Sequence, residues 1–143
     1  MSDYVQPTHK FVAVLNKKIP EGRLMNALAH ATAGLSATYP EVAAMRFDNY
    51  EDKSGNIHQS ISDNPFIILR ADNSNKLRAL RQQLVEQDIC FTDFVDTMTE
   101  GTYTEQQERT KNTNEEDLEY FAVVMFGENE VLNVLNKKFS LWH

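Results

Sequence analysis

A continuous apolar run, FVAVL at residues 11–15, constrains the fold of this chain more than any other feature. Five consecutive apolar residues bounded by polar ones are typical of a strand that is covered on both faces of a sheet. Pro20 follows after a short polar turn and suits the first turn of a helix, where its missing N–H costs nothing. A buried strand therefore leads into a helix, which favours an α/β fold.

The residues after Pro20 are predicted to form a helix over residues 21–37. Apolar side chains recur at helical spacing and mark one face: Leu24, Leu28, Ala31 and Leu35. The helix ends before Pro40, because the residue that precedes a proline is pushed out of the helical region. A helix with so many alanines carries little bulk, so it can lie close to a sheet.

Further periodic segments complete the α/β pattern. We expect strands at residues 66–70, 89–95 and 121–126, and helices at residues 74–86 and 128–138. Turn-forming residues separate two strand-like segments within residues 42–62, which predicts a β-hairpin there. Residues 100–119 are mostly acidic and polar with hardly any apolar side chains, so we expect a solvated loop or a mobile cover.

The length and composition of the chain bear on the number of domains and on the cellular compartment. A chain of 143 residues is a usual size for one domain, so we expect a single α/β domain over residues 1–143. No run approaches the roughly 18 apolar residues that span a bilayer, and residues 1–10 carry no export or organelle signal. The lone Cys90 cannot form an internal disulfide. We therefore expect a cytoplasmic protein that does not enter a membrane.

The net charge of −7 argues against nucleic acid as a partner. Nonspecific affinity for nucleic acid comes mostly from Lys and Arg side chains that neutralise phosphates, and the 14 basic residues of this chain are scattered. The adjacent pairs Lys17 with Lys18 and Lys137 with Lys138 are the exceptions. We expect no tight binding of tRNA unless these pairs converge in space.

Sequence motifs for tightly bound groups are missing. The chain has no phosphate-binding loop of the Walker type, no glycine-rich dinucleotide turn and no paired cysteines at zinc spacing. Its four histidines include no His-x-x-x-His pair, and the turn at residues 52–63 departs from a calcium loop at the required glycine and glutamate positions. We therefore expect neither a cofactor nor a metal ion.

Three polar residues share a second face of the first predicted helix. Arg23, Asn26 and His30 stand at positions i, i+3 and i+7. Arginine can hold an anion, asparagine can orient a carbonyl, and histidine can move a proton near neutral pH. For His30 an alternative stays open, in which the ring hydrogen-bonds to the backbone where the helix meets the sheet. For Arg23 the alternative is a solvated surface side chain.

Several segments, taken in order, resemble one known family. They are KFVAVLN, IPEGRLMNALAHATAGL, a hairpin, FIILRADNSNKLRAL, FTDFVDTM and YFAVVMFG with a terminal helix. Over nearly the whole chain this order is similar to that of domain of unknown function 2000, a family that itself resembles the archaeal and eukaryotic class of peptidyl-tRNA hydrolases. The resemblance implies a mixed four-stranded sheet flanked by helices, with the hairpin as an addition.

The resemblance to the hydrolases also implies roles for particular residues. Arg23 falls where the hydrolases have a catalytic lysine, and arginine keeps the charge but does not readily release a proton. His30 stands in an Ala-His-Ala segment that agrees with the Ser-His-Ala segment of the hydrolases, and Asp96 matches an aspartate expected after that strand. The threonine expected where the last strand begins is absent from residues 119–122.

Three functional hypotheses follow. In the first, the chain binds a small molecule or a peptide in a cleft beside the first helix, with Asn26 as a ligand-binding residue. In the second, it is a diverged hydrolase of an ester or amide, in which Arg23 stabilises an oxyanion and His30 or Asp96 acts as base or orienting group. In the third, it is a homo-oligomeric interaction protein, for which a homodimer is the simplest case.

Overall fold

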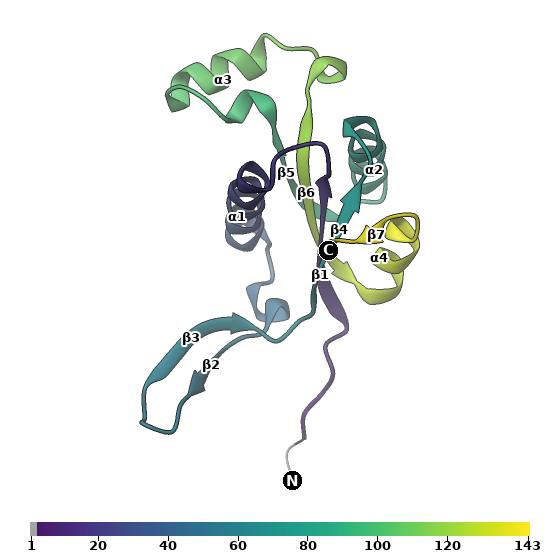
Figure 1. Ribbon diagram of the computed structural model, residues 1–143. Helices are drawn as coiled ribbons and strands as arrows, with labels where there is room; N and C mark the ends of the chain where they lie inside the picture. Colours follow the sequence, from purple (N-terminus) through teal and green to yellow (C-terminus); the bar gives the residue numbers. More distant parts are fainter. Residues whose placement is uncertain (1–2) are drawn as a thin grey trace.

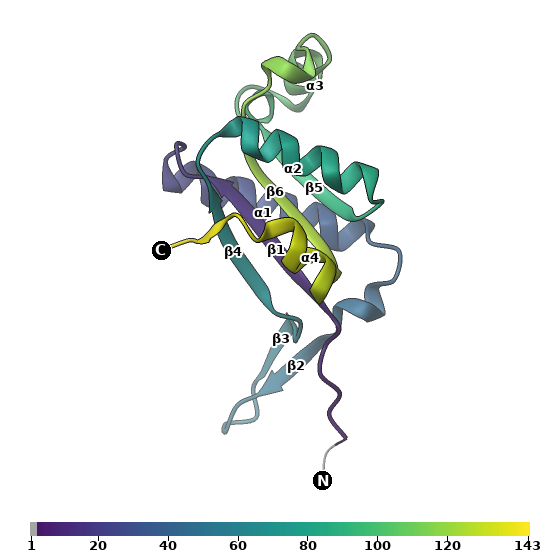
Figure 2. The same ribbon diagram turned by 90° about the vertical axis from the view of Figure 1, so that its right-hand side faces the viewer.

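A computed structural model describes residues 3–143 as a mixed sheet with helices on both faces and a separate hairpin (Figures 1 and 2). The strands are β1 (His9–Asn16), β2 (Phe47–Glu51), β3 (Ile57–Ser62), β4 (Phe66–Ala71), β5 (Cys90–Val95), β6 (Tyr120–Glu128) and β7 (Ser140–Leu141). The α-helices are α1 (Glu21–Thr38), α2 (Ser74–Glu86), α3 (Tyr103–Lys111) and α4 (Asn129–Asn136). The α/β class expected from the sequence is confirmed.

The main sheet has the strand order β5-β6-β1-β4-β7. β1 is its central strand, paired parallel with β4 and antiparallel with β6, and every residue of β1 from Phe11 onward is buried. The expectation of four strands was wrong, because β7 adds a fifth strand at the edge through two residues opposite Leu69 and Arg70. A strand of two residues is too short to leave an alternating pattern in the sequence. β4 and β5, joined through α2, are also not neighbours.

The two faces of the sheet carry different helices, so the body has three layers. Alternate side chains of β1 point to opposite faces. Phe11 and Ala13 join the core beneath α1, whereas Val12 and Val14 join the core beneath α2 and α4. Figure 1 shows α1 on one side of the sheet with α2 and α4 on the other. Within residues 3–143 no helix has both the length and the apolar character to cross a bilayer.

The expected hairpin is present and projects away from the body in both ribbon views. Every residue of β2, and all of β3 except Ser62, is exposed. Its base is fixed by an ion pair in which Arg46 Nε lies 2.8 Å from Asp63 Oδ1. Arg46 has a positive φ of 52°, which turns the chain out of the body and into β2.

Residues 100–119 were expected as a solvated loop or a mobile cover. They lie outside the core, but they contain α3, so the expectation of a loop was wrong. Thr102 caps the helix by accepting a hydrogen bond from the backbone N–H of Glu105, and the Glu105 carboxylate accepts one from the N–H of Thr102. This reciprocal capping box forms a helix start without any apolar stripe. None of the residues of α3 is buried, and the helix lies beyond the end of the sheet (Figure 1).

Candidate functional site

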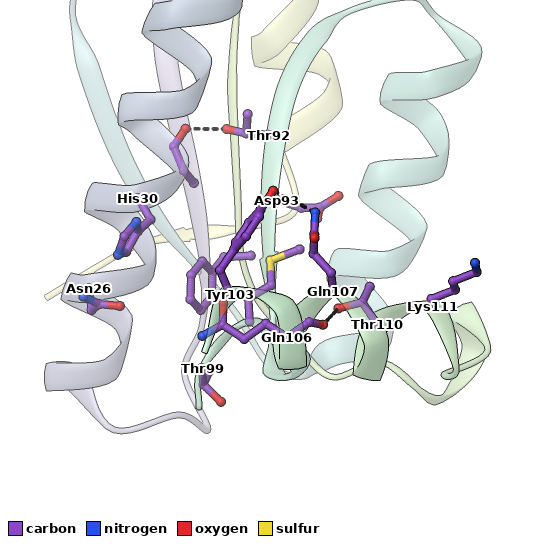
Figure 3. A pocket seen from close by; sticks show the side chains of 13 residues that line it. Asn26, His30, Thr92, Asp93, Thr99, Tyr103, Gln106, Gln107, Thr110 and Lys111 are labelled. Carbon is purple, nitrogen blue, oxygen red and sulfur yellow. Dashed lines mark hydrogen bonds between the residues drawn. The ribbon is translucent and has the colours of Figure 1, made fainter. Parts of the chain in front are cut away.

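A hollow of about 830 Å³ lies between α1, β5 and α3 (Figure 3). We call it the α1–α3 groove. Its lining comes from three places along the chain: Asn26, His30 and Ala31 of α1; Thr92, Asp93 and Phe94 of β5; Met98, Thr99, Tyr103, Gln106, Gln107, Thr110 and Lys111 around α3. The groove therefore brings together segments that are distant in the sequence.

The α1 wall of the groove carries two of the predicted site residues. The buried stripe of α1, which includes Ala27 and Ala31, faces the sheet, so Asn26 and His30 are left on an exposed face. The His30 ring stacks on Phe94, with 5.9 Å between ring centroids and 27° between the planes. No other described residue makes a hydrogen bond to the His30 ring. The alternative of a histidine satisfied by backbone at the helix–sheet junction therefore does not describe this side chain.

The floor of the groove is fixed to α1 by a side-chain hydrogen bond. The Thr92 hydroxyl donates to the carbonyl of Ala31 at 2.6 Å, which joins β5 to the middle of α1. Phe94, buried next to it, supplies the apolar surface on which His30 rests. The Asp93 carboxylate is paired instead with the Arg81 guanidinium of α2, at 2.8 Å. The floor is therefore apolar and its one carboxylate is already neutralised.

The α3 wall is held in place by polar contacts alone. The Thr110 hydroxyl donates to that of Thr97 at 2.7 Å, and the Arg109 guanidinium donates to the carbonyl oxygens of Thr97 and Glu100. These contacts tie α3 to the turn that follows β5. The amide and phenol groups of α3 point toward the groove in Figure 3. They are Tyr103, Gln106 and Gln107.

Arg23 lines a smaller pocket of about 230 Å³ that adjoins the α1–α3 groove. This hollow shares Asn26, Phe94 and Thr99 with the α1–α3 groove, so the two adjoin. Glu100 also lines it. Within residues 3–143 the Arg23 guanidinium makes no ion pair. Arg23 and His30 are therefore neighbours along one surface and do not line the same hollow.

Asp96, the fourth predicted site residue, is not among the residues that line either hollow. Its carboxylate accepts a hydrogen bond from the backbone N–H of Glu119 at 3.0 Å. Its own backbone N–H donates to the carbonyl of Glu119, also at 3.0 Å. Asp96 thus joins the end of β5 to the start of β6 and lies outside the lining of the groove.

The hydroxyl groups of the groove are also engaged. Thr92 donates to Ala31, and Thr99 donates to the carbonyl of Asp96 at 2.7 Å. The Tyr103 hydroxyl accepts a hydrogen bond from Gln107 Nε2 at 2.7 Å. Within residues 3–143 no group of three or more His, Cys, Asp or Glu side chains is placed to hold a metal ion. The groove can therefore offer a ligand hydrogen bonds from carboxamides and an imidazole above an apolar floor, together with the ammonium group of Lys111.

Comparison with known proteins supports the fold and leaves the activity open. The model of a family described as protein of unknown function (DUF2000) matches residues 9–143. Among solved structures, the fold is similar to that of a protein of unknown function from Agrobacterium tumefaciens strain C58, with a TM-score of 0.80 and 17% sequence identity over 95% of this chain and 98% of that one. At that identity the likeness shows the fold alone. No curated protein matches the sequence.

Proposed function

The chain belongs to the DUF2000 family, and we propose that it binds a small molecule or a short peptide in the α1–α3 groove. The observation that carries this proposal is the placement of His30. An exposed imidazole stacked on a buried phenylalanine, within a hollow of about 830 Å³, offers both a flat surface and free ring nitrogens to a ligand. Ligand sites in proteins commonly combine an apolar lining with a few convergent polar groups.

The lining indicates which chemistry the ligand carries. Asn26 and Gln106 present carboxamides, which pair with peptide groups because each has both a donor and an acceptor. Met98 and Phe94 supply apolar surface for a side chain or a ring. A short peptide, or a small molecule with an amide and a flat apolar part, meets both features.

Hydrolysis of an ester or amide has less support than binding. A hydrolase needs an activated nucleophile or a base held near the reacting bond. Of the two candidate bases, Asp96 does not line the groove and its carboxylate accepts from the backbone N–H of Glu119, while the His30 ring has no hydrogen-bonded orienting group among the described residues. The one carboxylate that lines the groove, Asp93, pairs with Arg81. We therefore assign Asn26 and His30 to ligand contact and propose no chemical step.

A thermal-shift screen tests the proposal. Metabolites, N-acetylated tripeptide amides and aminoacyl esters are added one at a time, because a ligand that binds the folded state alone raises the melting temperature. For each compound that raises it, we expect ¹H–¹⁵N spectra to shift at the amides of Asn26, His30 and Gln106. The variants His30→Ala and Asn26→Ala are expected to remove most of the stabilisation by ligand.

Gln83→Ala is the matched control for these variants. Gln83 is exposed on α2, across the sheet from the groove, so its removal should leave the ligand response unchanged. His30→Ala should itself melt within a few degrees of the native chain, because an exposed side chain contributes little to stability. Ligands whose amide shifts all lie away from the groove, or whose effect survives both groove substitutions, would contradict the proposal.

A further inference from the structure

A second hollow, of about 670 Å³, lies at the other end of the sheet from the α1–α3 groove. It forms where β1 and β5 begin and β6 ends, whereas the groove lies near the end of β5 (Figure 1). The two hollows share no lining residue. An inference about this second hollow therefore does not rest on the function proposed for the groove.

Aromatic rings in a fixed arrangement form one wall of the second hollow. The His9 ring stacks on Phe126 with 5.4 Å between centroids, and the Tyr39 ring meets Phe126 edge-on at 4.8 Å. Phe126 is buried, while His9 and Tyr39 are half-buried and line the hollow. The packing on Phe126 therefore holds two partly open rings in place before any ligand arrives.

Negatively charged residues also line this hollow. Asp88 and Glu128 both line the hollow, both are exposed, and neither makes an ion pair within residues 3–143. No Lys or Arg of the described chain lines it. Asp88 has a positive φ of 55° in the turn after α2, a conformation that Asp and Asn tolerate better than other non-glycine residues.

We propose that the second hollow binds a small organic ammonium ion that carries a flat apolar group. Flat apolar groups stack on aromatic rings, and exposed, unpaired carboxylates attract an ammonium group. The apolar group would lie against His9 and Tyr39, with the ammonium group directed to Asp88 and Glu128. The volume is sufficient for a molecule of this size.

Cys90 lines the same hollow and provides an internal reporter of its occupancy. It is half-buried, and it is the single cysteine of the chain. Burial raises the pKa of its thiol, so its alkylation should be slow and sensitive to whatever covers it. The rate of Cys90 modification by iodoacetamide therefore measures how far a ligand occupies the hollow.

The test compares three probes of similar size at about pH 7.5: the benzylammonium cation, benzyl alcohol and benzoate. We expect benzylammonium to slow the alkylation of Cys90 and to shift the amides of Ile89 and Gly127. Benzyl alcohol should bind about three- to tenfold more weakly, which corresponds to the loss of the two exposed charge pairs with Asp88 and Glu128. Benzoate should not bind.

The double variant Asp88→Asn with Glu128→Gln should reduce benzylammonium to the affinity of benzyl alcohol. Asparagine tolerates the positive φ at position 88, so the turn is kept. Asp48→Asn with Glu51→Gln on the exposed strand β2 removes the same two charges elsewhere and should leave binding unchanged. Equal binding of cation and alcohol, equal loss in both double variants, or amide shifts confined to the α1–α3 groove would overturn the proposal.

Discussion

Two asparagines have different roles in this molecule, because the side chain of one is exposed and that of the other is buried. Asn26 is exposed in the α1–α3 groove, whereas Asn16 is 1% exposed at the end of β1. Asn16 Nδ2 donates to the carbonyl of Tyr120 at 3.0 Å, and its side-chain oxygen accepts from the N–H of Lys18 at 3.0 Å. One asparagine is available to a ligand, and the other supports the turn that leads into α1.

This contrast gives a prediction for stability. Asn16→Ala should lower the free energy of unfolding by about 1 to 3 kcal/mol, because a buried carbonyl and a backbone N–H both lose their partner. Asn26→Ala should change it by less than about 0.5 kcal/mol. Urea unfolding followed by circular dichroism measures both. Equal effects of the two substitutions would contradict the division of roles between the two asparagines.

Tyr120 predicts how stability falls at high pH. Its ring is buried and its hydroxyl donates to Glu115 Oε2 at 2.7 Å. Burial, and then the hydrogen bond to Glu115, raise the pKa of Tyr120 well above its ordinary value. As the pH passes about 10, the unfolded chain loses this proton while the folded chain keeps it, so stability declines by up to about 1.4 kcal/mol per pH unit.

Tyr120→Phe should make that decline shallower. Urea unfolding of the native chain and the variant at about pH 9.5, 10.5 and 11.5 gives the slope of unfolding free energy against pH. Tyr103→Phe, at an exposed ring on α3, is the control and should keep the native slope. The prediction concerns the slope alone, since loss of the hydrogen bond also lowers stability at every pH. A Tyr120→Phe slope equal to the native one would show that the tyrosine ionises normally.

Among the four α-helices of residues 3–143, α3 has the least support from packing. It buries no residue, and its contacts with the turn after β5 are polar. Thr102→Ala should therefore open α3 locally, raising hydrogen exchange at the helix-bonded amides of residues 106–110 about fivefold, as expected for the loss of about 1 kcal/mol of capping energy. Global stability should not change. Thr104→Ala, within the same helix, is the control, and a matching rise in that variant would argue against the capping role.

The elements that bury an apolar face are predicted best. The exposed hairpin is predicted from its turn residues alone, and α3 is missed. The helix at residues 74–86 and the buried strands are predicted almost to their bounds, because leucine and valine spacing reports the core directly. A loop is predicted where α3 lies, because the residues of this helix carry no apolar stripe. The pattern Thr102-x-x-Glu105 is a readable sign of its start.

The same limit applies to the candidate site. Asn26 and His30 are predictable because two polar residues four apart on an amphipathic helix must share its exposed face. The opposite wall, with Tyr103 and Gln106, is missed together with α3. Asp96 is selected by resemblance, and the sequence holds no sign that its carboxylate accepts from the backbone of Glu119. Strand pairing decides that contact, and strand pairing is long-range.

For the whole molecule, the expected homodimer and the relation to peptidyl-tRNA hydrolases stay predictions. Exposed apolar side chains gather on the projecting hairpin, where Tyr50, Ile57 and Ile61 are each more than half exposed. Large exposed apolar groups are common at interfaces between proteins. Light scattering during size-exclusion chromatography measures the mass of the particle, and a mass of 16.4 kDa at every concentration would argue against a homodimer.

The charge of the whole molecule leads to the prediction that it does not bind tRNA tightly. Beyond the net charge of −7, several basic side chains already have carboxylate partners: Lys17 pairs with Asp72 at 3.0 Å, and Arg78 pairs with Glu115 at 3.0 Å. A phosphate contact at such a side chain would have to displace its carboxylate partner, and contacts at the other basic side chains would act against the repulsion of the acidic excess. In filter binding at about 0.15 M salt, we expect a Kd weaker than about 10 μM, within the range of nonspecific binding. The substitution Arg23→Ala should leave this Kd unchanged. Submicromolar binding that weakens steeply with salt and is lost in Arg23→Ala would overturn the prediction.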